Sequence, residues 1–350
     1  MFIIKTLCKF FSWGKKRYMA RIFMPTIHSV PYLRTPIKYI MNRLTKLLNV
    51  LILVLPMACT NPANTYSTID STAIPKDSTA ENFKIEDKGV NIAYDDSKKG
   101  DTTLVFIHGW GINKTYWKNQ DTAFSKHFRV VAIDLPGFGE SGKNRKSWKV
   151  EDYANDVSAV LNGLDLKNVI LIGHSMSGAI ALEAALNNQP RVIGLVGIDN
   201  FNTYGAKETP QTQKEIEQFF KAARTDYKKT VSAYVTQALF APSTPKSIRK
   251  RVTDDIANAD STIALDCMEQ SFSYPTDAKL KTLKMPLYLI NSSANPTDTL
   301  AFRRNGIAYR FFNVGKTGHY PMLEKPEKFN ALLEQVIEDI KTTKKQILKI

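Results

Sequence analysis

The chain has 350 residues, 43% of them hydrophobic, which is enough for one large folded domain or two of ordinary size. Its formal net charge is +15, but residues 1–58 hold ten Lys and Arg and no Asp or Glu. The remaining 38 basic and 33 acidic residues carry only +5 and form no basic stripe interleaved with aromatic residues, so the composition argues against a nucleic-acid partner.

The N-terminal residues have the composition of a targeting segment. Residues 1–40 are basic and irregular, and we interpret them as an extension that precedes the native start. The chain then resembles a bacterial lipoprotein signal, in which Arg43 and Lys46 precede an almost entirely apolar run, residues 47–57. That run is shorter than a comfortable membrane span. It ends in a small residue followed by Cys59, which resembles a lipobox and implies cleavage before Cys59 and lipidation of its thiol.

Two alternatives remain for residues 41–58, a plain secretory signal or an N-terminal anchor helix, because Pro56 departs from the stricter lipobox pattern. Residues 59–82 are rich in Ser, Thr, Asn and Pro and have few apolar side chains, so we expect a disordered tether there. The sequence thus predicts a bacterial envelope protein that is lipid-anchored to a membrane and faces the periplasm. Without lipidation of Cys59 the protein would be secreted.

The globular part, residues 83–350, alternates between predicted strands and predicted helices. The predicted strands are residues 83–85, 90–94, 103–107, 128–133, 169–173, 192–198, 285–290 and 308–312. The predicted helices outside the 200–278 block are residues 150–164, 179–186, 299–304 and 326–345. This alternation favours a mostly parallel sheet. Residues 200–278 contain helical patterns without a convincing strand, which predicts a helical cap inserted between two strands of the sheet.

A sharp turn between strand and helix is predicted at residues 173–178. A β-branched apolar run precedes it and an Ala/Leu run follows it. Between them, Ser175 is flanked two positions away on each side by the small residues Gly173 and Ser177. Small neighbours allow the strained turn that makes a serine hydroxyl project, a geometry known as the nucleophile elbow. Serine at position 177 replaces the usual glycine, and it is small enough for the turn.

Four segments together resemble the α/β-hydrolase superfamily, over about residues 83–345. They are residues 108–111 (His-Gly-Trp-Gly), residues 134–141 (Asp-Leu-Pro-Gly-Phe-Gly-Glu-Ser), the elbow, and residues 317–324 (Thr-Gly-His-Tyr-Pro-Met-Leu-Glu). The resemblance implies an α/β-hydrolase fold with a mostly parallel eight-stranded sheet, helices on both faces and an inserted helical cap. It also implies a serine hydrolase.

The chemistry of such an enzyme explains the residue types. A serine hydroxyl needs a base that takes its proton, and His319, in a loop that follows the last predicted strand, is the candidate base for Ser175. The oxyanion of the intermediate needs backbone N–H donors that already point at it. The elbow supplies the N–H of Met176, and the resemblance implies that Trp110 supplies the second.

The acid that orients the base is not at its usual position in this chain. Most members of the superfamily carry it after the strand that follows the cap, where this chain has Asn295. An asparagine accepts the histidine N–H but does not balance the charge of the imidazolium. Two aspartates are available, Asp199 at the end of the strand before the cap and Asp298 three residues beyond Asn295. We favour Asp199, and Asp298 remains the alternative.

No metal site or cofactor is predicted. The histidines do not cluster with cysteines or carboxylates at ligand spacing, and Cys8, Cys59 and Cys267 match neither a metal motif nor a disulfide framework. The glycine-rich turns do not match a dinucleotide-binding motif.

The sequence therefore predicts hydrolysis of a small, largely apolar ester or related acyl compound through an acyl-enzyme. A carbon–carbon bond hydrolase or a perhydrolase would use the same triad. A ligand-binding or sensor protein with little turnover is the alternative that Asn295 suggests. The oligomeric state does not follow from the sequence.

Overall fold

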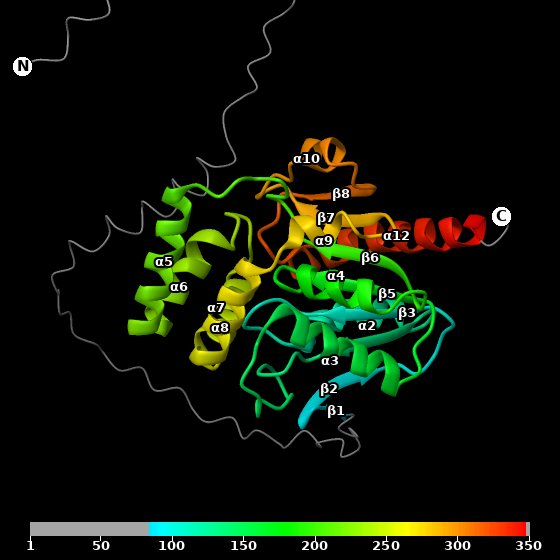
Figure 1. The fold of residues 1–350 in the computed structure, drawn as a ribbon, viewed down its shortest axis with the longest axis horizontal. Coiled ribbons are helices and arrows are strands. Elements are labelled where there is room, and N and C mark those ends of the chain that lie inside the picture. Colours follow the sequence, from blue (N-terminus) through cyan, green and yellow to red (C-terminus); the bar gives the residue numbers. More distant parts are fainter. Residues whose placement is uncertain (1–83, 348–350) are drawn as a thin grey trace, which may run out of the picture.

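The computed structural model describes residues 84–347, so the predicted N-terminal extension, signal and tether lie outside the described residues. An eight-stranded sheet with the order β1-β2-β4-β3-β5-β6-β7-β8 forms its centre (Figure 1). Strand β2 pairs antiparallel with both of its neighbours, β1 and β4. The pairs from β4 to β8 are parallel. The strands are β1 (Lys84–Asp87), β2 (Val90–Asp96), β3 (Thr103–Ile107), β4 (Arg129–Ile133), β5 (Val169–His174), β6 (Val192–Ile198), β7 (Leu287–Ser292) and β8 (Tyr309–Gly315). The predicted α/β-hydrolase fold is confirmed.

Helices cover both faces of this sheet. On one face, α3 (Val150–Gly163) packs against α4 (Ser177–Asn187), which itself contacts β5 and β6. On the other face, α12 (Pro326–Ile347) contacts β6, β7 and β8 together with α2 (Lys118–Phe124). Every residue of β3 and of β5 is buried, as expected of parallel strands covered on both sides.

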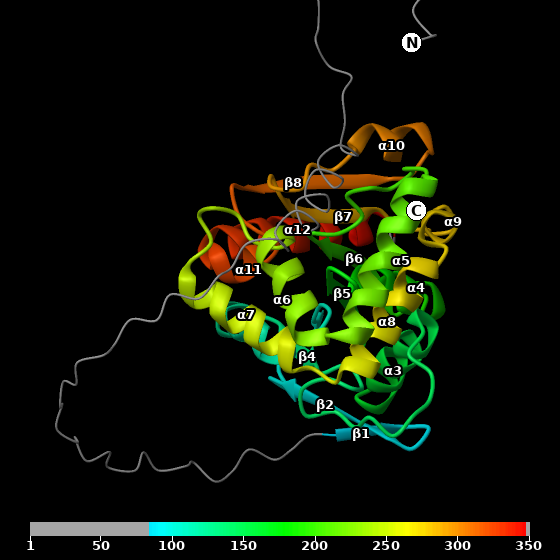
Figure 2. The ribbon, with the colours of Figure 1, turned by 90° about the vertical axis from the view of Figure 1, so that its left-hand side faces the viewer.

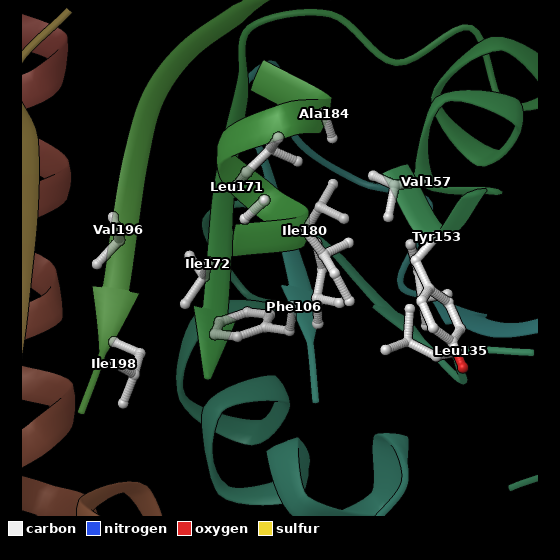
Figure 3. Packing of buried hydrophobic residues seen from close by; sticks show 14 of the residues in the cluster. Phe106, Leu135, Tyr153, Val157, Leu171, Ile172, Ile180, Ala184, Val196 and Ile198 are labelled. Atoms are coloured by element: carbon white, nitrogen blue, oxygen red, sulfur yellow. The ribbon is translucent and has the colours of Figure 1, made fainter. Parts of the chain in front are cut away.

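Apolar side chains of the helices fill the space above the strands. Figure 3 shows Leu171 of β5 and Ile180 of α4 on the side of the sheet that faces α3, with Leu135 and with Val157 and Tyr153 of α3 nearby. All five side chains are essentially excluded from solvent. Burial of each contributes about 1.5–3 kcal/mol, so this packing holds the strand that precedes Ser175 rigidly in place.

The insertion between β6 and β7 is helical. It contains α5 (Pro210–Thr225), α6 (Tyr227–Ala238), α7 (Lys246–Asn258), α8 (Ser261–Ser273) and α9 (Thr276–Leu280). Helices α5 to α8 lie beside one end of the sheet in Figure 1 and in front of it in Figure 2. The remaining helical elements are η1 (Lys114–Trp117), α10 (Thr299–Arg304) and α11 (Pro321–Glu324). Within residues 84–347, no helix combines the length and the apolar composition needed to cross a membrane.

The differences from the predicted elements concern short segments. Helices η1, α2, α9 and α11 were not predicted, and each has only four to seven residues. Such short helices have little intrinsic stability, and burial of side chains such as Tyr116, Trp117 and Phe124 stabilises two of them. Strands β7 and β8 extend beyond the predicted ends because they pair with each other as far as Ser292 and Gly315.

Candidate active site

Ser175 lies in a strained turn between β5 and α4. Its φ angle is +54°, in the left-handed region, and the residue belongs to neither the strand nor the helix. The turn leaves no space for side chains at two flanking glycines. A methyl group at Gly173 would lie 2.2 Å from the carbonyl oxygen of Ser177, and one at Gly178 would lie 2.2 Å from the amide nitrogen of Asn200. Both glycines are therefore required by close packing around the serine.

His319 approaches Ser175 from the loop after β8. Its Nε2 lies 2.7 Å from Oγ of Ser175, and its side chain is only 13% exposed. Two contacts with other segments hold the histidine backbone. The N–H of His319 donates to the carbonyl of Leu239 at the end of α6, and the ring of His174 bonds to the carbonyl of His319 through Nε2 at 2.7 Å. The helical insertion and the elbow thus both help to place His319.

Asp199 follows β6 and is also in the left-handed region, with φ at +47°. Its Oδ2 lies 2.5 Å from Nδ1 of His319, and its Oδ1 accepts the backbone N–H of Ser292 at 2.8 Å. Burial by itself raises the pKa of Asp199, but the hydrogen bond and the charge of His319, with the bonds from Ser292, outweigh burial and lower the pKa below its ordinary value. Asp199 therefore remains a carboxylate when it faces the histidine.

The alternative acid, Asp298, and the asparagine at the usual position of the acid, Asn295, occupy different places. Asp298 caps α10, where its Oδ1 accepts the N–H groups of Leu300 and Ala301, both at 3.1 Å. Asn295 contributes its carbonyl oxygen, which accepts a hydrogen bond from the side chain of Asn202 at 2.6 Å. Of these residues, the structure brings Asp199 and not Asp298 to His319.

The two proposed oxyanion donors lie on segments that touch beside Ser175. Met176 follows the serine directly, and Trp110 follows Gly109 in the loop after β3. A methyl group at Gly109 would lie 3.3 Å from Cβ of Ser175, so this loop runs against the serine. In the part of the chain that the structure describes, neither the Met176 N–H nor the Trp110 N–H donates to another protein group. The indole of Trp110 donates to the carbonyl of Ala264 in α8, 2.6 Å away.

Two further histidines lie close to this site but are buried. Burial and the neighbouring His319 lower the pKa of His174 to about 3. Burial also lowers the pKa of His108, which is completely enclosed. Both rings are therefore neutral at physiological pH and act through hydrogen bonds.

Several residues around the triad were not singled out by the sequence. Ser292 contributes only a backbone N–H, which no motif records. Glu324 ends the fourth motif, and its Oε2 accepts the N–H of Gly318 at 2.9 Å and the hydroxyl of Thr244 at 2.8 Å. Glu324 therefore ties the loop that carries His319 to the helical insertion. Among the described residues no group of His, Cys, Asp or Glu is arranged to hold a metal ion.

The model of the Alpha/beta hydrolase family matches residues 104–332, which is more than half of the chain. The chain belongs to the alpha/beta hydrolase family. The match includes all four motifs and every residue of the candidate triad and oxyanion hole.

Curated relatives of the chain include esterases. It is 31% identical over 149 residues to a pimeloyl-(acyl-carrier protein) methyl ester esterase of Aliivibrio fischeri, which is 42% of this chain and 56% of the relative. It is 29% identical over 141 residues to the enzyme of that name from Photorhabdus laumondii, covering 40% of this chain and 52% of the relative. The chain thus spans about half the length of these relatives.

Solved structures share the fold. A thermophilic esterase from Thermogutta terrifontis superimposes with a TM-score of 0.65 at 22% identity, covering 75% of this chain and 99% of the esterase. An esterase from Exiguobacterium antarcticum gives a TM-score of 0.65 at 21% identity, covering 73% of this chain and 98% of the esterase. At this level of identity the likeness shows the fold alone.

Proposed function

We propose that this protein is a serine hydrolase that cleaves a small, largely apolar ester or related acyl compound through an acyl-enzyme intermediate. The observation that carries the proposal is the hydrogen-bonded chain from Ser175 through His319 to Asp199, with distances of 2.7 and 2.5 Å. A hydroxyl, a base and a buried carboxylate in this order form the arrangement that activates a serine nucleophile.

The first half of the reaction is acylation. Oγ of Ser175 attacks the acyl carbon while its proton passes to Nε2 of His319, and Asp199 stabilises the resulting imidazolium. The oxyanion accepts hydrogen bonds from the N–H groups of Met176 and Trp110. The intermediate then collapses: the bond from the acyl carbon to the alcohol oxygen breaks, and the alcohol leaves with the proton from His319.

The second half repeats these steps with water. His319 takes a proton from water as the water oxygen adds to the acyl carbon, and the same N–H groups stabilise the second oxyanion. Collapse breaks the bond to Oγ, and Ser175 regains a proton from His319. The products are an acid and an alcohol, and the enzyme returns to its starting state.

The preference for an apolar acyl group is supported by the helices over the site. A methyl group at Gly111 would meet Ile256 of α7 at 3.0 Å, and one at Gly137 would meet Ile263 of α8 at 2.6 Å. Leu239, which follows α6 and whose carbonyl binds the His319 N–H, is also buried. Ile256, Ile263 and Leu239 therefore place hydrocarbon of the helical insertion against the loops that surround Ser175.

A sensor or binding protein without turnover has less support than it has from the sequence alone. That alternative rests on the asparagine at position 295. A protein without turnover would lack a carboxylate next to His319, whereas here Asp199 supplies one.

Two measurements test the proposal on the full-length protein. A fluorophosphonate probe should label Ser175 covalently, and a panel of p-nitrophenyl esters of increasing acyl length should be hydrolysed with a preference for short or medium chains. Absence of both labelling and hydrolysis would contradict the proposal and favour the binding protein.

We also propose that the mature protein begins at Cys59 and is anchored in a bacterial envelope membrane through a lipid on its thiol. The support comes from the basic, then apolar, then small-residue pattern of residues 41–58. A diacylated cysteine provides the two-chain anchor that stable membrane attachment needs.

Replacing Cys59 by Ala should move the protein from the membrane fraction to the soluble fraction of the producing cells. The same substitution at Cys267, which is buried in α8, is the matched control and should leave the distribution unchanged. Mass spectrometry of the parent should find lipid on Cys59. A parent without lipid, together with a Cys59→Ala variant that remains membrane-bound, would refute the anchor.

A further inference from the structure

Ser177 occupies the one position of the elbow where this chain departs from the usual glycine. Its side chain is completely buried, and its hydroxyl donates a hydrogen bond to the backbone carbonyl of His108. Ser177 is the first residue of α4, and His108 follows β3. The bond therefore joins the helix that follows the nucleophile to the loop that carries Trp110.

The ring of His108 continues this connection. Its Nε2 accepts the backbone N–H of Leu135 at 2.9 Å, and a backbone N–H can only donate. The neutral ring therefore carries its proton on Nδ1. That nitrogen lies 2.8 Å from the carbonyl oxygen of Gly109, to which it donates. The tautomer of His108 thus follows from its two partners.

The carbonyl of Gly109 and the N–H of Trp110 belong to the same peptide group. A trans peptide is planar, so its C=O and N–H point in opposite directions. The hydrogen bond from His108 to the Gly109 carbonyl therefore determines where the Trp110 N–H points. The bond from Ser177 holds the preceding peptide, between His108 and Gly109, so two consecutive peptides of this loop are fixed.

We propose that Ser177 is a positioning residue for the oxyanion hole. Through the His108 carbonyl it fixes the loop that aims the Trp110 N–H, and it does so from the first residue of α4, directly after Ser175 and Met176 in the chain. The nucleophile and both oxyanion donors then move as one unit. This inference rests on the proposed hydrolase function, in which the Trp110 N–H stabilises the oxyanion.

Without the Ser177 hydroxyl, the His108 carbonyl loses its donor and the loop gains freedom. Complete removal of one oxyanion donor lowers kcat by about 10²–10³. Because the Trp110 N–H would be misaligned and not deleted, we expect a loss of about tenfold or more. The loss should fall on kcat, since the oxyanion forms only in the transition state.

The test compares three variants of the full-length protein. Ser177→Gly and Ser177→Ala remove the donor, and the glycine is the usual family residue. Ser177→Cys keeps a nearly isosteric side chain with a weaker S–H donor. Ser271→Ala is the matched control, since its hydroxyl bonds to the Met268 carbonyl within α8. For each, kcat is divided by the number of active sites titrated with a fluorophosphonate, which removes any contribution from misfolded protein.

We expect kcat per active site to fall at least about tenfold in Ser177→Gly and Ser177→Ala, to an intermediate degree in Ser177→Cys, and not at all in the control. KM should change little, and affinity for a trifluoromethyl ketone, which forms a bound oxyanion, should fall in parallel with kcat. A kcat per active site within twofold of the parent in the glycine variant would overturn the inference. A parent that neither hydrolyses esters nor reacts with the probe would instead refute the proposed function.

Discussion

Replacing Ser175 by Ala should abolish ester hydrolysis while the fold stays intact. Loss of the nucleophile of a catalytic triad lowers turnover by on the order of 10⁴–10⁶, because the remaining residues no longer act as a unit. Within residues 84–347, the hydroxyl of Ser175 has one side-chain hydrogen-bond partner, His319, so its removal should leave the packing of β5 and α4 unchanged. Steady-state kinetics with the best p-nitrophenyl ester measures the effect.

The control for this experiment is the Ser271→Ala variant, which removes a hydroxyl from the helical insertion. Its activity and its thermal unfolding temperature should equal those of the parent. Circular dichroism should show that the Ser175→Ala protein unfolds at the same temperature as well. If this variant retains turnover within tenfold of the parent, Ser175 does not form an acyl-enzyme.

Replacing Asp199 by Asn should lower kcat by up to about 10⁴ with little loss of stability. The amide does not balance the positive charge that His319 acquires when it takes the serine proton. It also presents an N–H₂ group that favours the wrong tautomer of the imidazole. The geometry survives, since the side-chain oxygen of Asn still accepts the N–H of Ser292.

Asp298→Asn is the matched control. It makes the same change of a carboxylate to an amide at the cap of α10, where asparagine serves about as well as aspartate. Kinetics on both variants separates the roles of the two aspartates. An inactive Asp298→Asn protein beside an active Asp199→Asn protein would show that the loop after β7 carries the acid.

Because the pKa of Asp199 is lowered, the stability difference between the parent and the Asp199→Asn variant depends on pH in a defined direction. Its folded-state pKa lies below its ordinary value of 3.8, so its contribution to stability is complete above pH 3.8 and is lost as the pH falls through the lower folded-state value. The unfolding free energy of the parent, relative to that of Asp199→Asn, should therefore be constant near neutrality and should fall only at acid pH.

The strands, the elbow and the motifs could be predicted from the sequence because each rests on a local pattern. Continuous apolar runs indicate buried parallel strands, and small residues around Ser175 indicate the strained turn. The position of His319 after the last strand also followed, since α/β sheets gather their functional residues at the carboxyl ends of the strands.

The choice between Asp199 and Asp298 depended on tertiary structure. Strands β6 and β7 are paired so that the Ser292 N–H meets one oxygen of Asp199 while His319 meets the other. No sequence pattern contains this arrangement, because it depends on the register of two strands that are separated by the 88 residues 199–286, which include the whole helical insertion. Asp298 is also a carboxylate, but its Oδ1 accepts backbone N–H groups at the start of α10.

The same holds for Ser177, which the sequence marks only as a small residue that fits the turn. The hydrogen-bond partner of its hydroxyl is defined only by the pairing of β3 with β5, because that pairing brings the His108 carbonyl to the start of α4. Local sequence patterns thus predicted the fold and the candidate nucleophile and base. The packing of distant segments decided which carboxylate faces the base and how the oxyanion loop is held, because hydrogen bonds between segments depend on positions that only the folded sheet defines.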